Sequence, residues 1–219
     1  MTPPKRHRDV PNLACVSVIR RATLFIFLTL TLFAGAAAMA LEEPEYEVLK
    51  NIGDVEIRRY APYIVAEVTV TGQDADEQAF RILAGYIFGK NKSGEKMSMT
   101  APVETRGAEH AFVMERKYTL ETLPKPEDER VQLRRKDPRI VAARRFSGRW
   151  TEKNISQHRE ALLGDLAELG VEVTGNPELA RYNSPFTPWF LRRNEIIVPV
   201  DWSPTDTSPA VASETPARL

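Results

Sequence analysis

Alternating hydrophobic and polar residues predict strands in the first part of the chain, and a helix follows them. Across residues 64–70, apolar side chains occupy every second position, which is typical of a half-buried strand. Residues 75–88 place apolar side chains on one helical face, with Asp74 as the capping residue and Gly89 as the stop. Further strands are expected at 46–52, 55–58, 97–103, 112–114 and 118–120.

The second part of the chain repeats this order of elements. Strands are expected at 131–135 and 139–146, on either side of Pro138. Thr151 is placed to cap a helix that runs to Leu169. Short strands at 171–173 and 179–182 and a final strand at 194–200 complete the second part.

An internal repeat underlies this similarity. Residues 55–72 and 131–148 align without a gap at a spacing of 76, with eight identities, where roughly one is expected by chance. The identical pairs are Val55/Val131, Arg58/Arg134, Arg59/Arg135, Pro62/Pro138, Ile64/Ile140, Val65/Val141, Ala66/Ala142 and Gly72/Gly148. Two copies are too few for a solenoid. They suit a closed pseudo-twofold domain with a crevice lined by both copies.

We therefore predict an α+β fold made of a pseudo-twofold, duplicated β–β–α–β–β unit. Its strands form a distorted, mostly antiparallel β-barrel with two flanking helices. The folded domain is expected over 41–202, with halves of approximately 45–120 and 121–202. The tail, 203–219, is rich in Ser, Thr, Pro and Ala and is expected to be disordered.

The N-terminal 40 residues have the layout of a secretory signal peptide. Basic residues precede an apolar run at 24–33, small residues follow it, and Ala38-Met39-Ala40 fits a cleavage site. This pattern predicts a signal peptide over 1–40 and a periplasmic or secreted protein. The alternative is an inner-membrane anchor formed by 22–41, which nearly reaches the ~20 residues of a membrane span.

The cysteine content and the net charge limit which ligands and partners are expected. Cys15 is the only cysteine of the chain and precedes the apolar run, so the mature protein would have neither disulfide nor thiolate ligand. Residues 1–40 hold five basic residues and one acid, and the formal charge of the remainder is −4. This balance gives no reason to expect nucleic acid as a partner. A membrane partner is expected only if the N-terminal segment stays uncleaved.

Four runs of residues together resemble one protein family. They are YEVLKNIGDVEIRRY at 46–60, AGYIFGKN at 84–91, KMSMTAPV at 96–103 and RRNEIIVPV at 192–200. With these runs the chain resembles the SOUL heme-binding protein family over residues 45–201. The resemblance implies a distorted barrel of two pseudo-symmetric halves flanked by two helices. It also implies binding of heme or other tetrapyrroles, without known catalysis in most members.

We accordingly expect a non-enzymatic binder of heme or a related tetrapyrrole, acting as carrier, buffer or scavenger. If ~400 Å² of apolar surface leaves water, about 10 kcal/mol is gained before the entropy of association is subtracted. Micromolar binding needs only about −8 kcal/mol. Non-covalent binding therefore does not require an axial ligand from the protein. No nucleophile-elbow, zinc-protease, Walker or C-x-x-C motif is present to indicate an enzyme.

The resemblance points to the first helix and the C-terminal loop as the heme-facing region. A second apolar stripe on the helix contains Phe80, Leu83, Ala84 and Ile87. Beside it, Arg81 is either the partner of a propionate or a solvated helix charge.

In the loop, Phe186 and Trp189 lie next to Pro185 and Pro188. They either form a stacking wall for the ligand or cap one end of the barrel.

Iron ligands are harder to assign. Met97 and Met99 share a face, and we interpret them as core residues, with pocket lining or iron ligation as alternatives. His110 lies in a polar turn and is expected to be a solvated loop residue. His158 lies in the middle of the second helix. A packed or surface histidine is the favoured interpretation, and His158 is otherwise the candidate metal ligand.

Two charged features leave other functions open. The run 192–195 is expected to pair its charges across the halves rather than to form a catalytic or phosphate-binding cluster. Arg144 occupies the repeat position of Val68, so either a bulge turns it outward or it reaches a polar cavity. The alternative function is a general hydrophobic small-molecule receptor that resembles regulator effector-binding domains. An acid in the crevice would favour it, and Glu67, aligned with Ala143, is the candidate.

Overall fold

The computed structural model describes residues 41–203. The predicted signal peptide or anchor over 1–40, and the predicted disordered tail from 204 on, lie outside these residues. Within the described part, neither helix combines the length and the apolar character that a membrane span requires.

Strands and helices follow the predicted order. The first half contains β1 (Tyr46–Ile52), β2 (Val55–Tyr60), β3 (Tyr63–Thr69), α2 (Ala75–Ile87), β4 (Val103–Arg106) and β5 (Glu109–Val113). The second half contains β6 (Gln132–Lys136), β7 (Arg139–Phe146), α3 (Glu152–Glu168), β8 (Glu172–Val173), β9 (Glu178–Arg181), the 3-10 turn η2 (Trp189–Leu191) and β10 (Asn194–Asp201).

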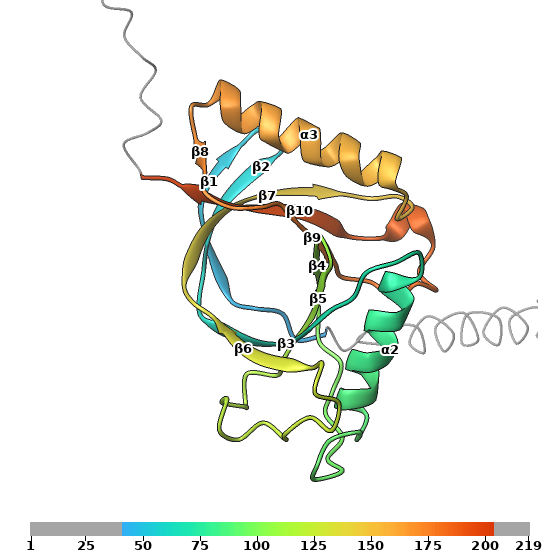
Figure 1. Ribbon diagram of the computed structural model, residues 1–219. Coiled ribbons are helices and arrows are strands. Elements are labelled where there is room, and N and C mark those ends of the chain that lie inside the picture. The colour runs from blue at the N-terminus through green and yellow to red at the C-terminus, as the bar shows by residue number, and fades with distance from the viewer. Residues whose placement is uncertain (1–40, 204–219) are drawn as a thin grey trace, which may run out of the picture. The chain divides into compact units, whose positions relative to one another are not determined.

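The strands form one curled antiparallel sheet. Its order is β1-β2-β7-β10-β9-β4-β5-β3-β6, with β8 paired to β10. Seen end-on, the sheet curls into a ring whose first and last strands are β1 and β6, and α2 and α3 lie against its outside (Figure 1). The predicted α+β fold, a distorted antiparallel barrel with two flanking helices, is confirmed.

The register of the strands preserves the sequence repeat. Tyr63 faces Lys136 across β3 and β6, and a shift of 76 converts this pair into Arg139 and Tyr60, which face each other across β7 and β2. The same shift converts every other aligned pair of β3 and β6 into a pair of β7 and β2. The two copies therefore exchange their first strands and close the barrel through a pseudo-twofold axis.

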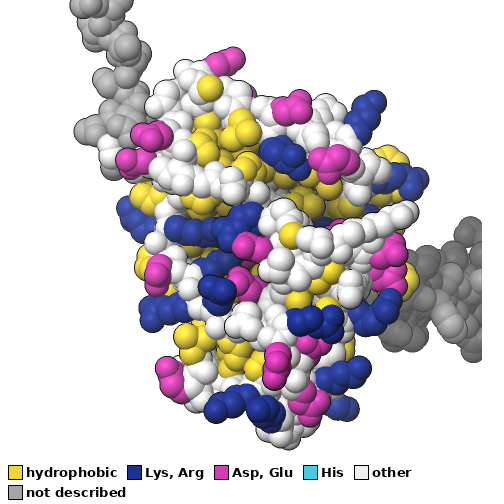
Figure 2. All heavy atoms as spheres, viewed as in Figure 1, with side chains coloured by type: hydrophobic (Ala, Val, Ile, Leu, Met, Phe, Trp, Pro, Cys, Tyr) yellow, Lys and Arg dark blue, Asp and Glu magenta, His cyan; other side chains and the backbone are white. Residues whose placement is uncertain are grey.

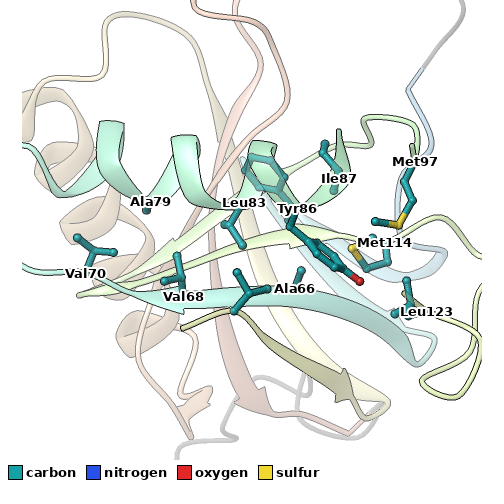
Figure 3. Packing of buried hydrophobic residues seen from close by; sticks show 12 residues of the cluster. Ala66, Val68, Val70, Ala79, Leu83, Tyr86, Ile87, Met97, Met114 and Leu123 are labelled. Carbon is teal, nitrogen blue, oxygen red and sulfur yellow. The ribbon is translucent and has the colours of Figure 1, made fainter. Parts of the chain in front are cut away.

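Successive side chains along the strands face opposite sides of the sheet and so form two packing layers, one beneath the helices and one inside the barrel. Ala66, Val68 and Val70 face outward beneath Leu83 and Tyr86 of α2 (Figure 3). Val65 faces the barrel interior together with Ala111 and Ala143. On the second copy, Leu162 and Leu166 of α3 cover Ala142 and Ile196 in the same way. Each helix thus buries the outer face of its own half.

The helix ends agree only in part with the prediction. Thr151 caps α3 by accepting a hydrogen bond from the backbone N–H of Asn154 at 3.3 Å. Asp74 occupies the cap position of α2, but its side chain makes no capping hydrogen bond.

Two predicted strands are wrong. Residues 118–120 form a turn region, and 97–101 lack strand pairing, so that β4 begins only at Val103. Tyr118 and Met97 instead pack onto the cluster beneath α2.

Arg144 is explained by the packing of α3. It extends outward, as Val68 does, and forms ion pairs with Asp165 of α3 at 2.5 Å and Asp54 at 3.0 Å. Arg144 pairs in register with Ile196, so neither a bulge nor an internal cavity is needed. The side chain fills the edge of the helix–sheet contact, and its charge is neutralised there.

The barrel interior contains paired charges. Glu178 accepts hydrogen bonds from Arg139 at 2.8 and 3.0 Å, and Lys136 lies between Glu178 and Glu104, at 3.3 and 2.5 Å. Tyr63 donates to Glu104 at 2.8 Å. In the centre of the end-on view, side chains that include both signs of charge cover the opening left by the ribbon (Figure 2).

A second cluster surrounds Glu195. Its carboxylate accepts from Arg58 at 2.6 Å, from Tyr182 at 3.0 Å and from Arg193 at 3.0 Å. Arg193 also pairs with Glu43 at 3.0 Å. The expected pairing of the 192–195 charges across the halves is confirmed, because Arg58 belongs to the first copy.

These partners lower the pKa values of the buried acids. Burial alone would raise the pKa of Glu178, but Arg139 and Lys136 lower it from 4.5 to about 2. Burial likewise opposes the charge of Glu195, yet Arg58 and Arg193 lower its pKa. A carboxyl whose pKa is lowered on folding stabilises the fold above its unfolded pKa, and this stabilisation is lost as the pH falls.

We predict that acidic pH destabilises the fold because Glu178 becomes protonated. As the pH falls from 4.5 toward about 2, the free energy of unfolding should decrease. Protonation removes the negative charge of Glu178 that pairs with Arg139. Glu178→Gln should remove this part of the pH dependence, and at neutral pH it should destabilise by about 3–5 kcal/mol because Arg139 loses its partner. Urea denaturation at a series of pH values measures both effects, with exposed Glu129→Gln as the control. An unchanged acid profile in Glu178→Gln would contradict the assignment.

Candidate functional site

Helix α2 carries apolar side chains on two faces, and this distinguishes it from a simple packing helix. Its inner face buries Ala79, Leu83, Tyr86 and Ile87. Its outer face exposes Phe80, of which 44% of the surface is accessible, and Phe88 follows at the helix end. The Phe80 ring contacts Phe112 edge-on, with the centroids 5.4 Å apart, so Phe80 is held in place although it is half in solvent.

A cleft of about 350 Å³ lies between the start of α2 and the segment before β10. Its apolar walls are Phe80, Val103, Trp150 and Pro185. Its polar rim consists of Asp76, Glu77, Arg181 and Asn183. Trp150 is fixed in this wall, because its Nε1 donates to Asn194 Oδ1 at 2.7 Å and the Arg192 guanidinium lies 4.2 Å from its ring centroid.

A second hollow of about 460 Å³ continues on the other side of Phe80, along the outer face of α2. Phe80, Ala84, Gly85 and Phe88 form its apolar floor. Glu77, Arg81 and Lys90 border it. Because Phe80 lines both hollows, they form one apolar surface around this ring, which we call the Phe80 cleft.

Three cationic side chains border the Phe80 cleft, and they differ in their ion pairs and burial. Arg81 forms an exposed ion pair with Glu77 at 2.6 Å. Arg181 is mostly buried, pairs with Asp76 at 2.9 Å and donates to Thr105 Oγ1 at 2.9 Å. Lys90 pairs with no carboxylate in the described part of the chain. Lys90 is therefore the cation most readily offered to an anionic ligand.

The structure divides the sequence-predicted site residues between cleft and core. Phe80, Arg81 and Ala84 lie at the Phe80 cleft. Leu83 points toward the sheet, Ile87 and Met97 lie at the end of α2, and all three are buried in the same cluster (Figure 3). Met99 is partly buried against that cluster. These core side chains shape the helix position but do not line the cleft.

Residues 184–191, which we call the aromatic loop, connect β9 to β10. Only Pro185 of this loop lines the Phe80 cleft. Phe186 and Trp189 are exposed, and Trp189 contacts Phe190 edge-on with the centroids 5.5 Å apart. The loop lies at the right of Figure 1, between the start of α3 and the start of α2. Neither aromatic side chain forms a wall of the cleft.

The two described histidines lie outside the cleft lining. The prediction for His110 as a solvated loop residue is wrong: it is buried in β5, and its Nδ1 lies 3.3 Å from Asp76 Oδ1. Burial lowers its pKa, while Asp76 opposes this shift. His158 stacks on Phe146 with the centroids 4.3 Å apart. No group of metal-binding side chains is formed by residues 41–203.

Sequence reasoning missed Trp150, Arg181, Val103, Phe88 and Lys90. Trp150 directly precedes the cap of α3, and the pseudo-twofold arrangement brings the start of α3 near the start of α2. A groove lined by both Asp76 of α2 and Glu152 of α3 documents this proximity. The repeat could therefore have predicted that Trp150 lies near α2, because the N-terminal ends of the two equivalent helices meet at the pseudo-twofold axis. The position of Lys90 depends on the turn after α2, which has no such signal.

The fold and cleft define a class of protein: a pseudo-twofold α+β barrel with an apolar ligand-sized hollow on its outer surface. The sequence matches the family model described as SOUL heme-binding protein over residues 41–199. The chain belongs to this family. No curated protein matches the sequence.

Solved structures share the fold at low sequence identity. The EcmrR C-terminal domain is similar with a TM-score of 0.52 and 10% identity, covering 71% of this chain and 98% of that one. A hydrolase from Listeria innocua is similar with a TM-score of 0.51 and 13% identity, covering 70% and 94%. At these identities the likeness supports the fold alone.

We predict unequal losses of stability for substitutions at two residues of α2. Leu83→Ala should lower the free energy of unfolding by about 2–5 kcal/mol, because it leaves a cavity in the core. Phe80→Ala should lower it by about 1 kcal/mol, since the ring is half exposed and loses mainly its contact with Phe112. Urea unfolding of both variants measures the difference. Similar losses in the two variants would contradict the division of α2 into a core face and a cleft face.

Proposed function

We propose that the Phe80 cleft binds heme or a related tetrapyrrole without catalysis, and that the protein is a carrier, buffer or scavenger. The observation that carries this proposal is the continuous apolar surface on both sides of Phe80, bordered by Lys90, Arg81 and Arg181, in a chain of the SOUL family. A tetrapyrrole is a flat apolar disc with two carboxylates at one edge. Apolar walls and a cationic border are the features that such a ligand requires.

The lining fits the macrocycle and its carboxylates but offers the iron no ligand. Neither part of the Phe80 cleft is lined by histidine, methionine, cysteine or tyrosine. When bound, heme would supply its iron and its porphyrin face. The protein residues would hold the disc through Phe80, Phe88 and Trp150, with Lys90 and Arg81 as partners of the carboxylates.

Openness of the site favours reversible binding. Phe80 and Phe88 remain partly exposed, so a bound disc would keep part of its surface in water. Such a site gains less from apolar burial than an enclosed cavity does. It suits a protein that takes up and releases its ligand. We propose that this happens in the periplasm or outside the cell, on the basis of the N-terminal residue pattern alone.

The alternative function, a receptor for hydrophobic cations, depends on an acid in the crevice. Glu67 is half-buried and forms an ion pair with Arg134. It does not line the Phe80 cleft. Asp76 does border the cleft, but it pairs with Arg181 and approaches His110. The surroundings of these acids favour an anionic ligand over a cationic one.

Hemin titration tests the proposed site. The protein should sharpen and shift the Soret band with one-to-one saturation, and Phe80→Ser should weaken binding by about tenfold or more, because the shared wall is lost. Lys90→Ala and Arg81→Ala should each weaken it by about 2- to 10-fold through the carboxylates.

Control variants distinguish hemin binding in the cleft from nonspecific binding elsewhere on the protein. Leu120→Ser, at an exposed apolar residue in another loop, should bind as the wild type does. Trp189→Ala should have little effect, since the ring does not line the cleft. A titration identical to buffer alone would eliminate the proposal, and equal affinity in Phe80→Ser would move the site elsewhere.

Iron should contribute little to affinity. Because the lining has no iron ligand, protoporphyrin IX without metal should bind within about threefold of hemin. Its dimethyl ester, which lacks free carboxylates, should bind more weakly. Competition measured by tryptophan quenching compares the three ligands. Hemin binding that exceeds that of the metal-free macrocycle by a hundredfold would show that a protein group ligates the iron.

A further inference from the structure

The aromatic loop exposes four large apolar side chains. The accessible fractions are 95% for Phe186, 65% for Leu191, 59% for Phe190 and 48% for Trp189. None of them lines the Phe80 cleft. Contiguous exposed apolar groups of this kind mark a surface that contacts another body.

Hydrogen bonds within the protein hold the loop in this shape. Arg192 donates from Nη2 to the Pro185 carbonyl at 2.7 Å and from Nε to the Thr187 carbonyl at 2.9 Å. The other loop carbonyls with a protein donor are those of Ser184, Pro188 and Trp189. Pro185 and Pro188 have no N–H to satisfy. Because these five carbonyls already have donors, contact of this part of the loop backbone with a bilayer removes little hydration.

Two chain segments at the loop carry a net positive charge. Segment 145–151 touches it through a hydrogen bond from the Gly148 N–H to the Trp189 carbonyl at 3.0 Å. Segments 145–151 and 183–194 together contain four arginines and no acidic residue. Arg193 pairs with Glu43 and Glu195, whereas Arg149 and Arg192 pair with no carboxylate in the described chain. Arg149 lies 5.8 Å from the Trp189 ring centroid.

We propose that the aromatic loop is a membrane-contacting surface that inserts into the interface of an anionic bilayer. Tryptophan and phenylalanine rings are favoured at that depth, and flanking arginines are attracted by anionic headgroups. A twofold contact between two copies would place the same loop, and its arginines, opposite themselves. Like charges would oppose that contact, so the charge pattern favours lipid over self-association.

Membrane contact goes beyond ligand binding and requires no tetrapyrrole. It would also place the Phe80 cleft near the bilayer, because Pro185 belongs both to the loop and to the cleft wall. A flat apolar ligand dissolved in the membrane would then have a short route to the site.

The test uses the full chain in phosphatidylcholine–phosphatidylglycerol vesicles whose acyl chains carry bromine, which quenches tryptophan on contact. The wild type should be quenched, and Trp189→Phe should lose most of the quenching. Phe186→Ser with Phe190→Ser should reduce it by about threefold or more, because two of the four inserted side chains are lost. Arg149→Gln should reduce it further in anionic vesicles than in pure phosphatidylcholine.

All variants keep residues 1–40, so a contribution of that segment is the same in each. Leu120→Ser is the matched control, since it also replaces an exposed apolar side chain with serine, and it should leave the quenching unchanged. Near-UV circular dichroism verifies that each variant is folded. Equal quenching in the wild type and Trp189→Phe overturns the proposal. Quenching that survives Phe186→Ser with Phe190→Ser overturns it as well. A loop-dependent change in sedimentation without quenching would assign the surface to a second copy instead of lipid.

Discussion

The ion pair between Arg58 and Glu195 joins the first strand pair of one copy to the last strand of the other inside the barrel. Both side chains are almost completely buried, and the closest approach is 2.6 Å. Burying two charges is costly unless they stay paired, so this contact fixes how the halves meet. Buried Glu178 and partly buried Arg139 form a second pair, at 2.8 Å. The interior is therefore filled by groups that cannot separate without a large penalty.

This filling determines where a ligand can bind. An apolar disc inside the barrel would have to displace the paired carboxylates of Glu104, Glu178 and Glu195. The outer surface of α2 imposes no such cost, because Phe80 and Phe88 already lie at the boundary with water. The barrel thus serves as a rigid support, and the proposed site lies on the helix that the support positions.

The two copies share a register but have diverged in chemistry. Val68 packs beneath α2, whereas its equivalent, Arg144, forms ion pairs with Asp165 and Asp54. One helix is consequently held by an apolar contact and the other partly by charges at its edge. The same divergence inside the barrel places Tyr63 opposite Glu104 and its equivalent, Arg139, opposite Glu178. Duplication fixed the geometry, while individual substitutions added ion pairs at the edge of the apolar contact under α3.

The sequence determined both helices, most of the strands and the pseudo-twofold arrangement, because alternation, helical spacing and the 76-residue repeat are local patterns that constrain the backbone directly. It also indicated Phe80 and Arg81. It could not separate Phe80 from Leu83, since one helical turn contains both and only the sheet decides which side is buried. Trp150, Arg181 and Lys90 come from three distant segments, and only the tertiary structure brings them to one helix. His110 shows the same limit: its turn-like sequence is polar, yet strand pairing in β5 removes it from water.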